Sequence, residues 1–236
     1  MIDVRPFASL GGANHGWLKA KHHFSFANYH DPARMNWGRL RVWNDDEIAP
    51  GTGFDPHPHR DMEIITYVRD GAITHRDNLG NEGRTEAGDV QIMSAGTGVV
   101  HSEYNLEPGT TRIFQIWIMP DRRGTKPNWG AKQFPKALRE AGFEVLASGR
   151  PGDAGNGALP LNVNGAVMAA TLKAGQTLTT ALGPDRAAYL VPAKGAVTVN
   201  GVALNARDGA GIVDEPKLAI TATEDSELVL VEVAKE

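Results

Sequence analysis

The sequence contains no cysteine, which excludes disulfide bonds, thiolate metal sites and cysteine nucleophiles. It also lacks any run of about 18 apolar residues, the length that a membrane-spanning helix requires. The first residues, "MIDVRPFASLGG", carry Asp3 and Arg5 and have no apolar segment of the kind found in a secretory signal peptide. These absences predict a cytoplasmic protein with no membrane partner.

Positive charge is also scarce. Lys and Arg number 24 against 28 Asp and Glu, which gives a net charge of −4. A general nucleic-acid binder normally presents a basic patch and a high pI, so this balance argues against direct nucleic-acid binding. With 41% hydrophobic and 22% charged residues, the 236-residue chain can fill the core of one large domain or of two ordinary ones.

Helical periodicity is rare as well. The best candidate is residues 135–143, which begin with a proline and contain Gly142, so a short helical connection is expected there. Elsewhere, short strand-like stretches alternate with turn residues at 38–44, 63–71, 72–78, 88–96 and 112–120. This spacing is typical of β-sandwiches and barrels, so the sequence predicts an all-β fold with short helical connections.

After residue 143 the same pattern resumes, which indicates two β domains of one architecture. "EIITYVRDGAITHRDNLGNEG", from residue 63, and "AAYLVPAKGAVTVNGVAL", from residue 187, both run strand, Gly, strand, turn. "AGDV" at 87–90 likewise has a counterpart in "RDGAGIV" at 207–213. We expect domains at 1–133 and 134–236. Because the two domains can bury a face against each other, we also expect a monomer.

Imidazole and indole are confined to the first domain. All eight histidines lie at or before residue 101 and all five tryptophans at or before residue 129. Beyond Phe143 the only aromatic residue is Tyr189. A chemical site that needs imidazole can therefore be built only from the first domain, and the second is expected to be a scaffold or an interface.

Two pairs of residues have the spacing of metal ligands on strands. In "GFDPHPHRDME", which begins at Gly53, His57 and His59 lie two apart, and residues two apart on a strand share a face at about 6.6 Å. In "GTGVVHSEYN" (96–105), His101 and Glu103 have the same relation. If the two strands are neighbours, three imidazoles and a carboxylate face a common point. That set suits zinc, iron, copper or nickel, and an octahedral ion would keep positions open for water, substrate or dioxygen.

The remaining candidates are weaker. Glu63 shares the parity of His59 if no bulge intervenes, so it is either an alternative ligand or a buried partner beside the metal. Either pair of residues alone is weak evidence, and the two pairs together favour a metal. Five histidines lack partner spacing: His15, His22, His23, His30 and His75. Those of "HHFSFANYHDP" (22–32) are expected to make local hydrogen bonds rather than to bind metal. The sequence thus predicts that His101→Ala loses bound metal and that His75→Ala does not.

These residues lead to a known family. The pattern G-x5-H-x-H-x3-E-x7-G, from Gly51 to Gly71, resembles the first cupin signature, and G-x2-H-x3-N, from Gly98 to Asn105, resembles the end of the second. "RVWNDDEIAPGTGFDPHPHRDMEIITYV" and "GDVQIMSAGTGVVHSEYN" are similar to the pirin family of bicupins, strongly over residues 1–135 and by pattern beyond them. The resemblance implies two cupin domains, which are jelly-roll β-barrels, packed face to face with one metal in the N-terminal domain.

The resemblance also implies a ligand set. The ligands of the family fall here on His57, His59, His101 and Glu103, with Glu63 as a neighbour. The usual ion is Fe²⁺, and other divalent ions, namely Zn, Ni, Co, Mn and Cu, also occupy such sites.

Bacterial members of the family are similar to quercetin 2,3-dioxygenases. The implied reaction opens the heterocycle of a flavonol with O₂ and releases CO, and Glu103 is the base that takes the proton of the 3-hydroxyl. The implied partners are thus a flavonol-like aromatic substrate and O₂. Four aromatic side chains either line a pocket for this flat substrate or belong to the core: Phe24, Phe26, Trp43 and Phe54.

Two other functions stay open at this point. Eukaryotic members of the family resemble redox-sensitive transcription cofactors, which implies an iron-binding sensor that modulates a protein partner. A zinc-dependent isomerase or hydrolase-like enzyme would use the same ligands without needing oxygen. Because cupin folds host many chemistries, only turnover separates these functions.

Overall fold

The computed structural model describes residues 1–135, 139–140, 142–153 and 155–235. Nearly all of the regular structure in these ranges is β-strand, and the helical segments are the 3₁₀ turns η1 (Phe7–Ser9), η2 (Pro32–Arg34) and η4 (Pro151–Asp153). The all-β prediction is confirmed. The helix expected over 135–143 includes residues 136–138 and 141, which lie outside the described residues.

The first half of the chain forms a barrel from two antiparallel sheets. A seven-stranded sheet has the order β12-β9-β6-β11-β4-β3-β2, and a four-stranded sheet has the order β5-β10-β7-β8. The strands are β2 (Gly11–Asn14), β3 (Leu18–His22), β4 (Leu40–Ile48), β5 (Thr52–His59), β6 (Glu63–Asp70), β7 (Ala72–Asp77), β8 (Glu82–Glu86), β9 (Val90–Ser94), β10 (Val99–Asn105), β11 (Thr111–Ile118) and β12 (Asn128–Lys132).

The second half repeats this architecture. Its seven-stranded sheet has the order β1-β20-β17-β22-β15-β13-β14, and its four-stranded sheet has the order β16-β21-β18-β19. The strands are β1 (Ile2–Arg5), β13 (Glu144–Ser148), β14 (Leu159–Pro160), β15 (Gly165–Leu172), β16 (Thr177–Ala181), β17 (Arg186–Lys194), β18 (Val197–Val199), β19 (Val202–Leu204), β20 (Gly209–Ile212), β21 (Lys217–Ala222) and β22 (Ser226–Ala234).

The repeated pattern of strand, Gly, strand and turn in the sequence corresponds to equivalent turns in the two barrels. Gly71, between β6 and β7, has φ +74°, and Gly195, between β17 and β18, has φ +75°. Both glycines adopt the left-handed conformation that side chains disfavour. A Cβ at Gly71 would lie 2.6 Å from the Thr111 hydroxyl, so the corner has no room for a side chain. Similar turns thus join corresponding strand pairs in the two halves.

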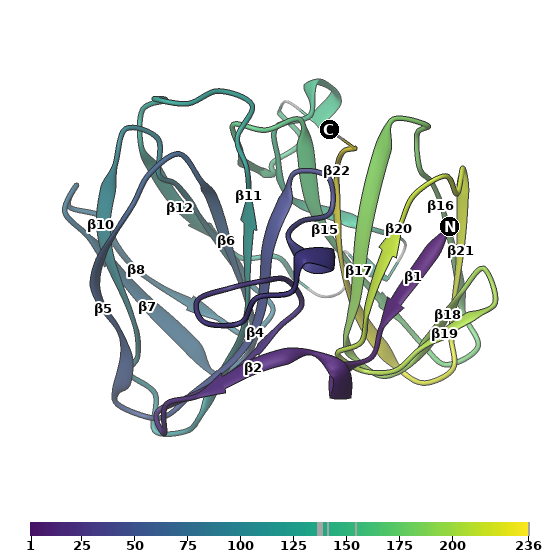
Figure 1. Ribbon diagram of the computed structural model, residues 1–236, viewed down its shortest axis with the longest axis horizontal. Helices are drawn as coiled ribbons and strands as arrows, with labels where there is room; N and C mark the ends of the chain where they lie inside the picture. The colour runs from purple at the N-terminus through teal and green to yellow at the C-terminus, as the bar shows by residue number, and fades with distance from the viewer. Residues whose placement is uncertain (136–138, 141, 154, 236) are drawn as a thin grey trace.

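The two large sheets pack face to face and share one apolar core (Figure 1). The interface between the two large sheets is called the joint below. On the central strands of the first sheet, alternate side chains such as Trp43, Tyr67 and Phe114 point into it. They meet side chains of β17 and β22, among them Tyr189, whose ring centroid lies 5.6 Å from that of Trp43. The other parity points into the first barrel, and this alternation decides which residues can reach its interior.

The first strand of the chain belongs to the sheet of the second half. β1 pairs with β20 in antiparallel register from Ile2 opposite Ile212 to Arg5 opposite Gly209, and Figure 1 shows it beside the green and yellow strands. The boundary between residues 133 and 134 stays a prediction, as does the monomeric state. The chain therefore connects the two halves twice, once between β1 and β2 and once between β12 and β13.

Candidate metal centre

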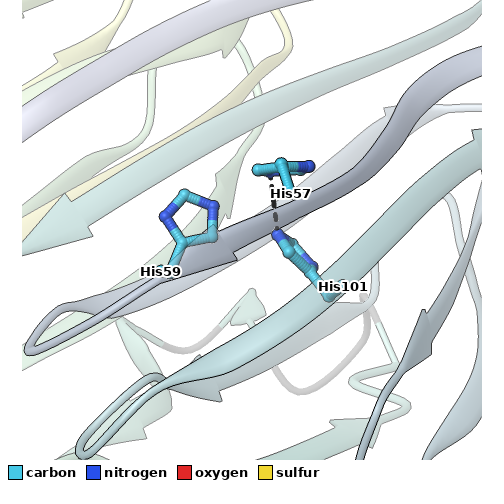
Figure 2. A group of neighbouring side chains, drawn as sticks. All are labelled: His57, His59 and His101. Carbon is cyan, nitrogen blue, oxygen red and sulfur yellow. Dashed lines mark hydrogen bonds between the residues drawn. The ribbon is translucent and has the colours of Figure 1, made fainter.

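Three histidines converge where β5 and β10 pair. The two strands are antiparallel neighbours with His101 directly opposite His57, and His59 lies two residues further along the same face (Figure 2). One ring nitrogen from each of the three lies within 4.8 Å of the others. The strand pairing that the sequence argument required is therefore present.

The spacing of the ring nitrogens fits a shared ion. Nε2 of His57 and Nε2 of His101 are 3.1 Å apart. Two nitrogens bound to one ion at about 2.0–2.1 Å would lie roughly 2.9–3.4 Å apart, for bond angles between octahedral and tetrahedral. The His57 ring is also oriented for this role, because its Nδ1 donates to the Asp55 carbonyl at 2.7 Å and leaves Nε2 as the free lone pair.

The surroundings of His59 and His101 favour the neutral form of both rings. Burial, reinforced by the neighbouring imidazoles His57, His59 and His75, lowers the pKa of His101 to about 2. Burial and His57 likewise lower the pKa of His59 to about 4. The ring of Trp117 packs edge-on against His59 with centroids 5.0 Å apart, which accounts for part of that burial. Neutral imidazole is the form that binds a metal.

Glu103 lies on the same strand but inside a set of amide and hydroxyl donors. Its Oε1 accepts hydrogen bonds from Thr66 Oγ1 at 3.2 Å and from Gln91 Nε2 at 2.7 Å, and its Oε2 accepts one from Gln115 Nε2 at 2.9 Å. Burial raises the pKa of Glu103 to about 7 although these three donors oppose the rise. Oε2 has only one donor, so it is the oxygen with room for a metal or a proton donor.

The donors around Glu103 form one row across the large sheet. The register places Asn44 opposite Gln115, Gln115 opposite Thr66, and Thr66 opposite Gln91. All point into the barrel, because their strand neighbours point into the joint between the halves. Sequence reasoning missed this row. A polar residue at an inward position of an otherwise apolar strand, as in "VQIM" or "IFQIWI", is the signal that could have found it.

Glu63 has a different role from the one its spacing suggested. It begins β6 in the large sheet, after a turn in which Asp61 has φ +49°, so the parity of β5 does not continue to it. It shares the parity of Ile65 and faces the joint. There it accepts hydrogen bonds from Ser94 Oγ at 2.6 Å and from the Asn162 backbone N–H at 3.0 Å. Glu63 therefore holds a segment of the second half.

His75 also differs from the expectation that it lacks a partner. It is fully buried, its Nδ1 lies 3.3 Å from Nδ1 of His101, and its Nε2 lies 3.1 Å from Oδ2 of Asp77. A second group of possible ligand atoms, one from each of three residues, has mutual distances within 4.8 Å: His75, His101 and Glu103. Among the other histidines, Nδ1 of His22 contacts Oδ1 of Asn44 at 2.8 Å, and His15 and His30 are exposed.

Comparisons with known proteins agree with this geometry. Two family models match the chain, "Pirin" over residues 3–118 and "Quercetinase C-terminal cupin domain" over residues 145–233. A pirin-like protein of Caulobacter vibrioides is 70% identical over 234 residues, which cover 99% of this chain and 100% of that protein. The chain belongs to the pirin family.

Two Escherichia coli proteins extend the comparison. A quercetin 2,3-dioxygenase of strain K12 is 42% identical to this pirin over 233 residues, covering 98% of this chain and 97% of that protein. The crystal structure of the bacterial pirin YhhW in complex with nickel(II) superposes with a TM-score of 0.91 at 40% identity and covers 99% of each chain. The bicupin architecture of this pirin is thus shared by a solved structure that contains a divalent transition metal.

A small cavity adjoins the centre of this pirin. Its volume is about 60 Å³ and its walls include Phe26, Phe54, Asp46 and Gln115. Phe54 lies against His57 with ring centroids 6.4 Å apart, and Phe26 packs edge-on against Trp117. Of the four aromatic residues proposed for a pocket, Phe26 and Phe54 line this cavity. Phe24 and Trp43 belong to the core between the barrels.

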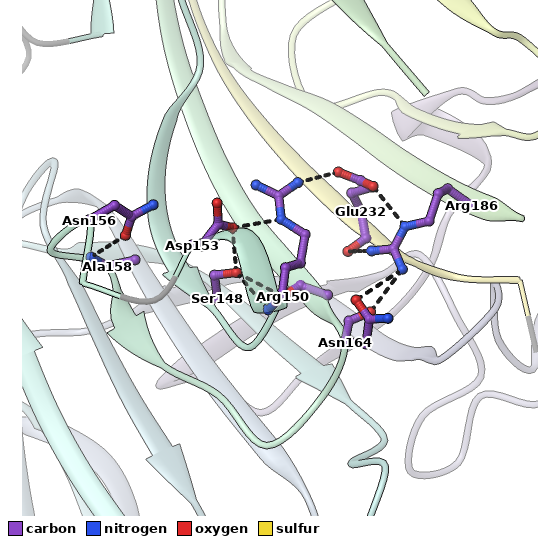
Figure 3. Close-up of polar contacts among 9 residues, drawn as sticks. Ser148, Arg150, Asp153, Asn156, Ala158, Asn164, Arg186 and Glu232 are labelled. Atoms are coloured by element: carbon purple, nitrogen blue, oxygen red, sulfur yellow. Dashed lines mark hydrogen bonds and ion pairs between the residues drawn. The ribbon is translucent and has the colours of Figure 1, made fainter. Parts of the chain in front are cut away.

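The second barrel of this pirin has a charged cluster of another kind (Figure 3). Arg150 donates to Asp153 at 2.6 Å and to Glu232 at 2.5 Å, and Arg186 donates to Glu232 at 2.7 Å. The charges of this cluster are compensated within it, and the second half of the sequence contains no histidine. The cluster therefore stabilises the barrel and offers no ligand set like that of the first half.

No helix in the described part of the chain has the length and apolar character to cross a membrane. A cytoplasmic location stays a prediction.

Proposed function

We propose that this pirin is a metal-dependent dioxygenase that opens the heterocycle of a flavonol-like substrate with O₂ and releases CO. The observation that carries the proposal is the convergence of three imidazoles beside a buried carboxylate and a cavity. The quercetin 2,3-dioxygenase of Escherichia coli, at 42% identity, supports the substrate class. We further propose that His57, His59, His101 and Glu103 hold one divalent transition metal, with Fe²⁺ as the resident ion.

A bound metal would polarise the substrate oxygen and mediate electron transfer to dioxygen. The chain itself moves the proton. Oε2 of Glu103 takes the proton of the flavonol 3-hydroxyl, because it is the carboxylate oxygen that accepts only one hydrogen bond, from Gln115. Two carbon–carbon bonds of the heterocycle break, the carbon between them leaves as CO, and both atoms of O₂ enter the ring-opened ester. Glu103 returns the proton to the carboxylate of that product.

The size of the cavity bears on substrate entry. At about 60 Å³ it is far smaller than the roughly 300–1,000 Å³ of an ordinary small-molecule pocket. A flavonol would therefore need more room than this cavity offers. The same observation favours a second candidate function, an iron-binding sensor that modulates a protein partner, because a sensor needs the ligands but no substrate pocket.

The test is CO release and O₂ uptake when iron-loaded protein meets quercetin, with metal content measured in the same samples. We expect stoichiometric CO from the wild type. We expect a loss of at least about 100-fold in Glu103→Gln, the low end of what general-base catalysis contributes. His30→Ala, which changes an exposed histidine, is the control and should keep full activity. A wild type that binds iron fully and releases no CO would overturn the enzyme proposal in favour of the sensor.

A further inference from the structure

We propose that His75 and Asp77 are positioning residues that fix the tautomer of His101, so that its Nε2 lone pair faces the lone pair of His57. Only a cation can then join the two rings. The inference rests on the proposed metal centre and extends it to two residues that are not themselves ligands. It follows from a chain of hydrogen bonds that runs along β7 and across to β10.

The chain begins at the Asp77 carboxylate, which is surrounded by donors. Its Oδ1 accepts hydrogen bonds from the backbone N–H groups of Leu79 at 2.9 Å and Asn81 at 3.0 Å, and its Oδ2 accepts one from Asn81 Nδ2 at 2.8 Å. An ionised carboxylate can only accept hydrogen bonds. The proton in the 3.1 Å contact with His75 therefore belongs to Nε2 of His75.

The next link is the His75 ring. A neutral imidazole carries one N–H, so protonation at Nε2 leaves Nδ1 of His75 as an acceptor. The ring stacks on Trp129 at a centroid distance of 5.0 Å and an interplanar angle of 12°, which fixes its plane. The 3.3 Å contact between Nδ1 of His75 and Nδ1 of His101 then requires His101 to be the donor.

The last link is the contact between His101 and His57. With its proton on Nδ1, His101 presents a lone pair at Nε2, and the hydrogen bond from His57 Nδ1 to the Asp55 carbonyl leaves a lone pair at Nε2 of His57. These two atoms are 3.1 Å apart, and in this pair of tautomers neither carries a proton. In the other tautomer, His101 would donate to His57 and satisfy both rings without a metal. The His75–Asp77 pair therefore keeps the centre open to a cation.

Asp77→Asn tests the chain with little change of shape. The Asn oxygen can keep the backbone donors of the turn, whereas its amide now donates toward His75. This reverses each link and moves the proton of His101 to Nε2. We expect ¹⁵N NMR of the metal-free protein to show the Nδ1–H tautomer of His101 in the wild type and the Nε2–H tautomer in Asp77→Asn. Arg76→Gln is the matched control, because Arg76 lies between the two residues but points outward to Glu82.

Metal affinity gives a second, independent readout. Competition of Ni²⁺ between a chelator and metal-free protein should show binding about 10–100-fold weaker in Asp77→Asn and in His75→Phe, the usual cost of losing such a partner. Arg76→Gln should bind as the wild type does. The inference is wrong if metal-free wild type carries the Nε2–H tautomer, or if Asp77→Asn leaves both tautomer and affinity unchanged. Neither measurement depends on turnover, so a failure of the dioxygenase proposal would be seen separately.

Discussion

Two adjacent carboxylates on β4 meet opposite environments. Asp45 points into the joint, where it is paired with Arg69 and accepts a hydrogen bond from Arg207 Nε at 2.5 Å. Asp46 points into the first barrel, and its buried Oδ1 has no hydrogen-bond partner among the described residues. Burial, reinforced by the charges of Asp45 and Glu103, raises the pKa of Asp46 well above its ordinary value. One residue therefore stabilises the fold and the other strains it at neutral pH.

Asp46→Asn and Asp45→Asn should therefore have effects of opposite sign in the metal-free protein. Native Asp46 keeps a proton that the unfolded chain releases, so its contribution to stability falls as pH rises above 3.8. Asp46→Asn should be more stable than the wild type at pH 7 and should lose this advantage near pH 4, with Tm changing by about 2–4 °C per kcal/mol. Asp45→Asn should cost about 3–5 kcal/mol at pH 7, because it removes the carboxylate that pairs with Arg69 and leaves Arg207 with Glu47 alone, at 3.6 Å. Urea unfolding at both pH values measures this, and equal losses in the two variants would contradict it.

At the scale of single residues, the sequence predicts which side chains of one strand share a face. The convergence of His57, His59 and His101 follows from a period of two on paired strands. The parity argument fails for Glu63, because the turn at Asp61 moves it into another sheet. It cannot find His75 either, since its contact with His101 depends on which strand lies beside β10. Spacing within one strand is visible in a sequence, whereas the choice of neighbouring strand is not. Ligation of a metal by His57, His59, His101 and Glu103 stays a prediction.

The turn at Gly71 joins β6 to β7, the strand that carries His75 and pairs with β10. Gly71→Ala should destabilise the protein by about 2–4 kcal/mol, because the left-handed φ strains any side chain and the new Cβ would press on Thr111. Gly80→Ala is the matched control. Gly80 also has a positive φ, +89°, but a Cβ there would meet nothing within 4 Å, so only the strain of about 1 kcal/mol applies. Denaturant unfolding should separate the two variants, and equal losses would show that the contact with Thr111 has no weight.

Elements are predicted from the sequence where their pattern is local. The strand-like stretches and the echo between the halves are confirmed, because alternating side chains and left-handed turns leave marks in neighbouring residues. β1 is different. "IDVR" has the alternation of a strand, but nothing near it indicates that its partner is β20, more than 200 residues away. Such pairing depends on how the two halves pack in the folded protein.

The joint between the two barrels is the feature that makes the chain one molecule. His23 lies in it, fully buried, with its Nδ1 2.9 Å from the Tyr189 hydroxyl of the second half. Burial, and then the nearby cations Arg5, Arg34 and Arg207, lower the pKa of His23 to about 3. A charged imidazole at this position would have to be accommodated among arginines and apolar rings, so the joint should be sensitive to acid.

Metal-free protein should therefore lose stability as pH falls from 6.5, because unfolded His23 binds a proton that native His23 refuses until about pH 3. One such group contributes a slope of up to about 1.4 kcal/mol per pH unit. His59 and His101 add slopes of the same sign, so a variant is needed to isolate His23. Between pH 6.5 and 4.5, His23→Gln should reduce the slope of the unfolding free energy against pH by nearly the amount that the uptake of one proton contributes. Exposed His30→Gln should leave this slope unchanged. If both variants keep the wild-type slope, protonation of His23 is not what weakens the protein in acid.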